Sequence, residues 1–271
     1  MSFIVAHSLV GEPSATKLAL LLHGALGSGN NLRSLASKLS KVRPEYRFCL
    51  VDLRHHGASQ GAPPPNTLEA CARDLSVLIE QLGQEPEVLA GHSFGGKTSL
   101  MFAQLFPGRA RQVWVLDSNP GRQAPSDDNE VMRVIRSVRA TTTPAPERGS
   151  VVAELTAQGL SSGTANWLAT NLERSADGFV WRFNLDAINE LMLDYFRVDL
   201  WPVLESGATD SDFRVVVAER SDRWAPENRA RLEAFVEKNE RTKLHVVPNA
   251  GHWLHVDNPA FLLELMAQNL Y

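Results

Sequence analysis

The chain has 271 residues, of which 44% are hydrophobic and 21% are charged, and its formal net charge is -4. These totals predict a globular protein with a sizeable core and exclude a basic surface for nucleic acid. No apolar run approaches the roughly 18 residues of a membrane helix, and residues 1–10 have neither the basic start nor the apolar core of a secretory signal.

The two cysteines, Cys49 and Cys71, stand in apolar segments and have no spacing typical of a metal or redox site. We therefore expect buried free thiols and no metal. A reducing cytoplasm fits this pattern. We therefore expect a cytoplasmic protein, and an organelle is the alternative if a targeting segment has been removed.

In the first 117 residues, apolar runs alternate with helical patterns, and this alternation predicts a mostly parallel sheet flanked by helices. Strands are expected at 2–10, 17–22, 47–51, 87–90 and 113–116, and helices at about 30–39, 67–82 and 98–106. Ligands of such sheets bind beyond the C-terminal ends of the strands. We therefore expect the functional residues at that edge.

The alternation stops after Asp117 and returns near residue 206. The intervening residues have helical patterns at 131–138, 151–160, 165–172 and 185–196 and no convincing buried strand. The last part of the chain has strand patterns at 214–218 and 243–247 and helical patterns at about 226–236 and 259–270. The expected organisation is a core of residues 1–117 and 206–271, with residues 118–205 inserted as a helical lid over the active edge. An ordinary helical layer without a gating role is the alternative.

The strongest chemical signal is Gly-x-Ser-x-Gly at residues 91–95, between an expected strand and an expected helix. The flanking glycines permit a sharp, strained turn that exposes the Ser93 hydroxyl at the end of the strand. The N-terminus of the following helix favours negative charge at this point. The pattern predicts that Ser93 is a nucleophile for attack on a carbonyl. The alternative is a glycine-rich turn with an incidental serine.

An activated serine needs a base, and the base needs an orienting acid. His252 is the predicted base, because it lies just past the last expected strand on a loop from which its imidazole can reach Ser93. For the acid, two residues remain open. Asp117 comes directly after the strand expected at 113–116, and Asp222 follows the strand expected at 214–218.

The remaining machinery is an oxyanion hole, which needs two backbone N–H groups aimed at one point. Phe94, next to the nucleophile, is expected to supply one of them. Ala25 is expected to supply the other from the loop after residues 23–24, with Leu26 as its neighbour. Leu26, Trp181 and Trp253 are the residues that we expect at the substrate.

Five stretches carry a family resemblance: His-Gly-Ala-Leu-Gly-Ser at 23–28, Asp-Leu-Arg-His-His-Gly-Ala-Ser at 52–59, Gly-His-Ser-Phe-Gly-Gly-Lys-Thr at 91–98, Asn-Leu at 171–172 together with Val-Trp-Arg-Phe-Asn-Leu at 180–185, and Pro-Asn-Ala-Gly-His-Trp-Leu-His at 248–255. With them the chain resembles the α/β-hydrolase superfamily. More narrowly, it resembles the bacterial YbfF-type esterases and the alpha/beta-hydrolase domain-containing protein eleven group. The sequence departs from that group at His55, where the group usually has Asn, and at Glu219 and Arg220, where a Gly pair is common.

The resemblance implies an α/β-hydrolase fold, Asp117 as the acid, and hydrolysis of acyl esters, with thioesters as a further substrate class. It implies no cofactor and no metal. The expected function is thus a serine carboxylic-ester hydrolase that acts on small-molecule acyl esters through an acyl-enzyme. A cofactor-free lyase on the same fold and a ligand receptor that keeps the pocket are the alternatives. Acyl length, alcohol group and oligomeric state are not determined by the sequence.

Overall fold

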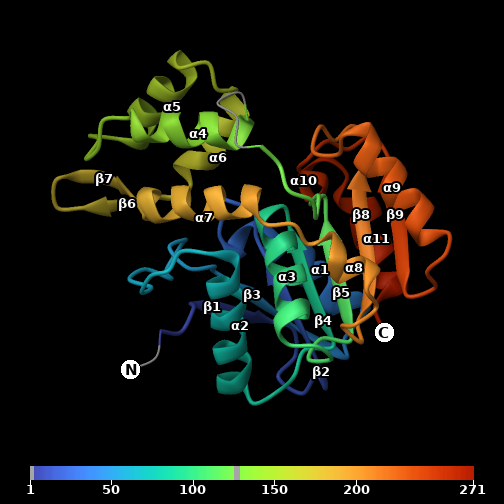
Figure 1. Cartoon of the computed structure of the whole chain (residues 1–271). Coiled ribbons are helices and arrows are strands. Elements are labelled where there is room, and N and C mark those ends of the chain that lie inside the picture. The colour runs from blue at the N-terminus through green and yellow to red at the C-terminus, as the bar shows by residue number, and fades with distance from the viewer. Residues whose placement is uncertain (1–2, 125–128) are drawn as a thin grey trace.

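The core of the protein is a seven-stranded sheet with the strand order β1-β3-β2-β4-β5-β8-β9 (Figure 1). The computed structural model describes residues 3–124 and 129–271. The strands are β1 (His7–Val10), β2 (Lys17–Leu22), β3 (Tyr46–Val51), β4 (Val88–His92), β5 (Gln112–Leu116), β8 (Asp212–Ala218) and β9 (Thr242–Val247). β1 is antiparallel to β3, whereas the other neighbours are parallel. The predicted fold class is confirmed.

Helices cover both faces of the sheet because both faces are apolar. Successive side chains of a strand point to opposite faces, so Leu20 and Leu21 of β2 enter two separate cores. Burial on both faces explains why these strands are continuous apolar runs in the sequence. One face is covered by α1 (Arg33–Val42) and α11 (Pro259–Asn269), and the other by α2 (Leu68–Leu82), α3 (Phe94–Leu105), α8 (Trp201–Glu205) and α9 (Pro226–Val236).

The inserted segment, residues 118–205, lies mainly beyond the C-terminal ends of the parallel strands (Figure 1). It contains α4 (Glu130–Arg139), α5 (Arg148–Ala157), α6 (Ser162–Ala169), β6 (Leu172–Ser175), β7 (Gly178–Trp181) and α7 (Leu185–Arg197). Its last helix, α8, packs against α3 in the core. Two short helices, η1 (Gly29–Leu32) and α10 (Leu254–Asp257), lie in loops at the same edge of the sheet.

Several boundaries differ from the sequence-based expectations. The first strand begins at His7, and Ser2 lies outside the described residues. The helix expected at 165–172 begins three residues earlier, because the side chain of Ser161 accepts a hydrogen bond from the backbone N–H of Thr164 and caps it. The β6–β7 hairpin was not predicted. Its residues are mostly only partly buried, so they lack the continuous apolar run of the central strands.

In the part of the chain that the structure describes, no helix is both long and apolar enough to cross a membrane. The same residues form no cluster of three or more His, Cys, Asp or Glu side chains that could hold a metal ion. Cys49 and Cys71 are buried and free, as expected.

Candidate active site

Ser93 occupies a strained turn between β4 and α3. Its φ is +52°, a conformation that non-glycine residues adopt rarely. The turn requires glycine on both sides: a Cβ on Gly91 would lie 2.0 Å from the carbonyl oxygen of Gly95, and a Cβ on Gly95 would lie 2.7 Å from that of Leu22. This close approach of helix and strand brings the Ser93 hydroxyl to the C-terminal end of β4.

The Ser93 hydroxyl contacts the His252 imidazole, which in turn contacts the Asp117 carboxylate. The Ser93 Oγ is 3.0 Å from Nε2 of His252, and Nδ1 of His252 is 2.8 Å from Oδ2 of Asp117. His252 lies on the loop between β9 and α10, and Asp117 directly follows β5. The structure therefore brings together three residues that are far apart in sequence and that the sequence analysis singled out.

Asp117 is completely buried and accepts three hydrogen bonds. Besides His252, its carboxylate accepts bonds from the backbone N–H of Ala218 (3.1 Å) and from the hydroxyl of Ser221 (2.7 Å). Burial raises the pKa of Asp117, and these donors oppose the rise because they stabilise the ionised form. The carboxylate is thus fixed in one orientation against the imidazole.

The second candidate acid, Asp222, lies elsewhere. Its side chain is 71% exposed, and its carboxylate is 3.3 Å from Nε of Arg223. The contact with Nδ1 of His252 is made by Asp117.

Burial lowers the pKa of His252 well below its usual range, and the nearby Arg223 guanidinium lowers it further. The imidazole is therefore neutral at pH 7 and can accept a proton at Nε2. Its backbone is held as well, since Nε2 of the buried His92 donates a hydrogen bond of 2.7 Å to the His252 carbonyl.

The two residues that we expect to supply the oxyanion hole, Phe94 and Ala25, both lie beside Ser93. Phe94 is the first residue of α3, so its N–H has no partner within the helix. Ala25 lines the cavity beside Ser93. The next N–H is not available, because Leu26 donates it to Nε2 of His56 at 3.1 Å.

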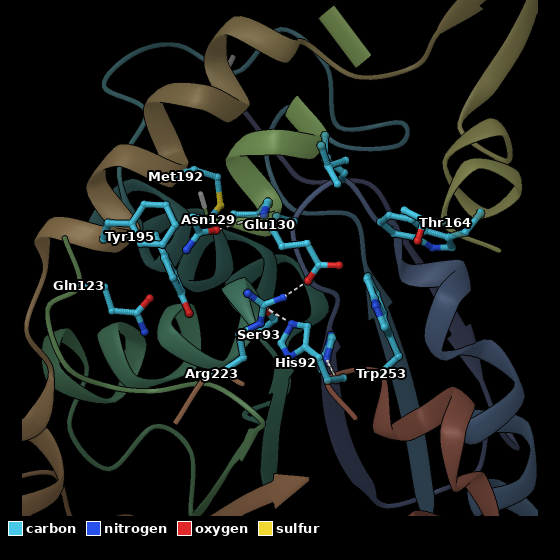
Figure 2. A pocket seen from close by; sticks show the side chains of 18 residues that line it. His92, Ser93, Gln123, Asn129, Glu130, Thr164, Met192, Tyr195, Arg223 and Trp253 are labelled. Atoms are coloured by element: carbon cyan, nitrogen blue, oxygen red, sulfur yellow. Dashed lines mark hydrogen bonds and ion pairs between the residues drawn. The ribbon is translucent and has the colours of Figure 1, made fainter. Parts of the chain in front are cut away.

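A cavity opens above Ser93 (Figure 2), and the space between its atoms, counted together with the part open to solvent, is about 660 Å³. Its roof comes from the inserted segment. The lining residues are Gly24, Ala25, Leu26, His92, Ser93, Gln123, Asn129, Glu130, Val131, Val134, Thr164, Trp167, Met192, Tyr195, Phe196, Arg223, His252 and Trp253. The expected substrate contacts Leu26 and Trp253 are in this set.

Trp181, which we expected at the substrate, does not line this cavity. Its indole stacks on Phe183 with ring centres 5.1 Å apart, and its Nε1 donates a hydrogen bond to the Thr141 hydroxyl at 3.1 Å. The structure thus places this side chain in the internal packing of the inserted segment and not in the cavity wall. The tryptophan of that segment that does face the cavity is Trp167 on α6.

Sequence reasoning missed most of the roof, including Trp167, Met192 and Tyr195, because α6 also packs against α5, and α7 also packs against α4. It also missed the two charged side chains of the cavity wall, Glu130 and Arg223. The position of Arg223 one residue after Asp222, just past a strand end, was the only available signal.

The comparison with protein families matches residues 19–259 to the model described as alpha/beta hydrolase fold. The chain belongs to the α/β-hydrolase family. It is 29% identical to the sn-1-specific diacylglycerol lipase ABHD11 of Mus musculus, over 98% of this chain and 85% of that protein. It is 26% identical to esterase YbfF of Escherichia coli, over 93% of this chain and 92% of that protein.

Among solved structures, the chain is similar to one described as a marine microorganism esterase, with a TM-score of 0.83 and 25% sequence identity over 98% of this chain and 99% of the other. These relatives support the family resemblance found in the sequence. The hydrolase is an enzyme of the esterase and lipase type.

Proposed function

We propose that this hydrolase cleaves small acyl esters through a covalent acyl-enzyme formed on Ser93. The observation that carries the proposal is the uninterrupted chain of contacts from the Ser93 hydroxyl through His252 to Asp117, at 3.0 and 2.8 Å. A nucleophile, a base and an orienting acid in this order are the arrangement that acyl transfer requires.

In the proposed reaction, Ser93 Oγ attacks the acyl carbon while Nε2 of His252 takes the hydroxyl proton. Asp117 holds the imidazole in the Nδ1–H tautomer and stabilises the imidazolium that forms. The N–H groups of Ala25 and Phe94 stabilise the negative oxygen of the tetrahedral intermediate. His252 then gives the proton to the leaving alcohol, and water deacylates Ser93 with His252 as base.

The cavity favours a largely apolar acyl group, because aliphatic and aromatic side chains form most of its wall. The relatives named as an esterase and a diacylglycerol lipase support an ester as substrate. A thioester can undergo the same attack at its acyl carbon and is a second substrate class for the same site. The inserted segment acts in this proposal as a lid whose inner face selects the substrate.

Replacement of Ser93 by Ala tests the proposal. Hydrolysis of a short ester should fall by several orders of magnitude, since loss of the nucleophile in subtilisin lowers kcat on the order of 10⁶-fold. An unchanged thermal melting curve should show that the variant is folded. The matched control is Ser34→Ala, because Ser34 is an exposed serine of α1 and its loss should leave turnover unchanged.

A fluorophosphonate probe followed by mass spectrometry gives an independent test, and we expect the adduct on Ser93. A burst of product equal to the enzyme concentration would support the acyl-enzyme. Turnover without a burst or covalent intermediate would instead favour a lyase. A protein that binds the ester but neither turns it over nor reacts with the probe would be a receptor.

A further inference from the structure

The wall of the candidate active-site cavity contains one pair of opposite charges. Of the described residues that line it, only Glu130 and Arg223 belong to the acidic and strongly basic residue types Asp, Glu, Lys and Arg. Glu130 is the first residue of α4 in the inserted segment, and Arg223 lies in the core after β8. The Glu130 carboxylate and the Arg223 guanidinium form an ion pair next to Ser93 (Figure 2).

Arg223 is held in place from several sides. Its backbone N–H donates to the Ser221 hydroxyl at 3.1 Å, and its carbonyl accepts a hydrogen bond from Nδ2 of Asn119 at 3.3 Å. Its Nε is 3.3 Å from the Asp222 carboxylate without forming a hydrogen bond there. The guanidinium is therefore a fixed cation of the cavity wall, and its side chain is only 19% exposed.

The Glu130 carboxylate contacts the Arg223 guanidinium from the inserted segment, and the Glu130 side chain is 42% exposed. In a partly water-excluded hollow, each charge acts strongly on a charged group that enters. A carboxylate on the substrate would be attracted by Arg223 and repelled by Glu130. An ammonium group on the substrate would be attracted by Glu130 and repelled by Arg223. An uncharged group meets a pair that is already neutralised.

We propose that the Glu130–Arg223 pair is a specificity determinant that restricts this cavity to uncharged acyl groups. The inference rests on the proposed function, since it concerns the substrate of the same site. Each member of the pair excludes substrates of its own charge and prevents its partner from binding substrates of the opposite charge. Selection by repulsion of the wrong ligand is a common route to specificity.

The pair also connects the inserted segment to the core, so its loss could alter catalysis without affecting charge selection. Three ethyl esters of similar length separate the two effects. They are ethyl hexanoate, which is neutral; monoethyl adipate, which ends in a carboxylate; and ethyl 6-aminohexanoate, which ends in an ammonium group. Only charge selection predicts opposite changes for the last two.

We expect the wild-type enzyme to prefer ethyl hexanoate. Glu130→Gln should raise kcat/KM for the adipate ester relative to the hexanoate ester by about tenfold, because it removes the only carboxylate among the described lining residues and leaves Arg223 with the exposed Asp222 carboxylate, 3.3 Å from its Nε, as its remaining charged partner. Arg223→Met should raise kcat/KM for the aminohexanoate ester relative to the hexanoate ester by about as much, because it leaves Glu130 uncompensated. If Arg223→Met does not fold, the Glu130→Gln ratio alone decides the matter.

Asp186→Asn is the matched control. Asp186 forms an ion pair of 2.7 Å with Arg139 that also connects α7 to α4, but neither residue lines the cavity. We expect this variant to leave both ratios unchanged.

Equal changes for all three esters, or no change in either ratio, would overturn the inference and leave the pair as a mechanical contact. The proposed function fails separately, and only if hydrolysis of ethyl hexanoate persists in Ser93→Ala.

Discussion

Three residues of the candidate active site have positive φ: Leu26 (60°), Ser93 (52°) and Asp117 (47°). Such conformations cost on the order of 1–3 kcal/mol each for non-glycine residues and persist only where the surroundings hold them. Here the backbone supplies the restraint. The N–H of Ser93 donates to the Leu116 carbonyl at 2.9 Å, and that of Asp117 donates to the Val216 carbonyl at 2.7 Å. Of the six described non-glycine residues with positive φ, three are thus the predicted nucleophile, the predicted acid and a residue of the predicted oxyanion loop.

For single residues, we also predict that replacing Asp117 and replacing Asp222 have very different effects on catalysis. Asp117→Asn should lower kcat by about 10⁴-fold, since an amide cannot stabilise the imidazolium and favours the wrong imidazole tautomer. Asp222→Asn should cost no more than about tenfold, because Asp222 is exposed and contacts Arg223 rather than His252. Steady-state turnover of a neutral ester by both purified variants measures the difference. Severe loss in Asp222→Asn alone would transfer the role of acid to that residue.

At the scale of helices and strands, two tryptophans of the inserted segment differ in their position relative to the cavity. Trp167 on α6 forms part of the cavity wall and packs against Trp253, with ring centres 4.7 Å apart. Trp181 on β7 packs within the segment. Whether a side chain lines the cavity or packs within the inserted segment therefore decides whether it can contact the substrate.

Alanine at these two positions tests this distinction. Trp167→Ala should raise kcat/KM for long acyl esters relative to acetate by about tenfold, because it enlarges the cavity. Trp181→Ala should reduce stability by about 2–3 kcal/mol through lost packing and leave the chain-length profile within about threefold of wild type. A series of p-nitrophenyl esters gives both profiles. If Trp181→Ala changes the profile as much as Trp167→Ala, the distinction between the cavity-lining and the internally packed tryptophan is incorrect.

On the scale of the whole molecule, Lys97 joins the inserted segment to the core. This fully buried residue of α3 donates hydrogen bonds to the carbonyls of Gly121 (2.7 Å), Tyr195 (2.7 Å) and Val198 (2.8 Å). Gly121 lies where the chain leaves the core, and the other two lie at the end of α7. The helix that begins directly after Ser93 is thus bonded to both ends of the segment that covers it.

Replacement of Lys97 by Met should therefore destabilise the protein. The variant keeps most of the side-chain volume but leaves three carbonyls without this donor, two of them in buried hydrogen bonds and one in a partly buried one, so we expect a loss of about 2–4 kcal/mol in the free energy of unfolding. Urea denaturation measures this change. Lys41→Met on the exposed surface of α1 should change stability by less than about 0.5 kcal/mol. Equal stability of the two variants would show that the Lys97 contacts contribute nothing net.

The sequence by itself determined the fold class and the turn that presents Ser93. Both depend on local signals: continuous apolar runs specify strands buried on two faces, and glycines around a serine permit one sharp turn between strand and helix. The order of strands and helices also indicated the insertion between β5 and β8. His252 was indicated by its place after the last strand, although its catalytic role remains a prediction.

Only the tertiary structure decided which aspartate lies against His252 and which tryptophan of the insertion faces the cavity. Asp117 and Asp222 both follow parallel strands, so their sequence contexts do not separate them. The pairing of Glu130 with Arg223 joins residues 93 positions apart. Contacts of this kind depend on how the insertion packs over the sheet, and side chains on helices with several buried faces give no local signal of which face meets the substrate.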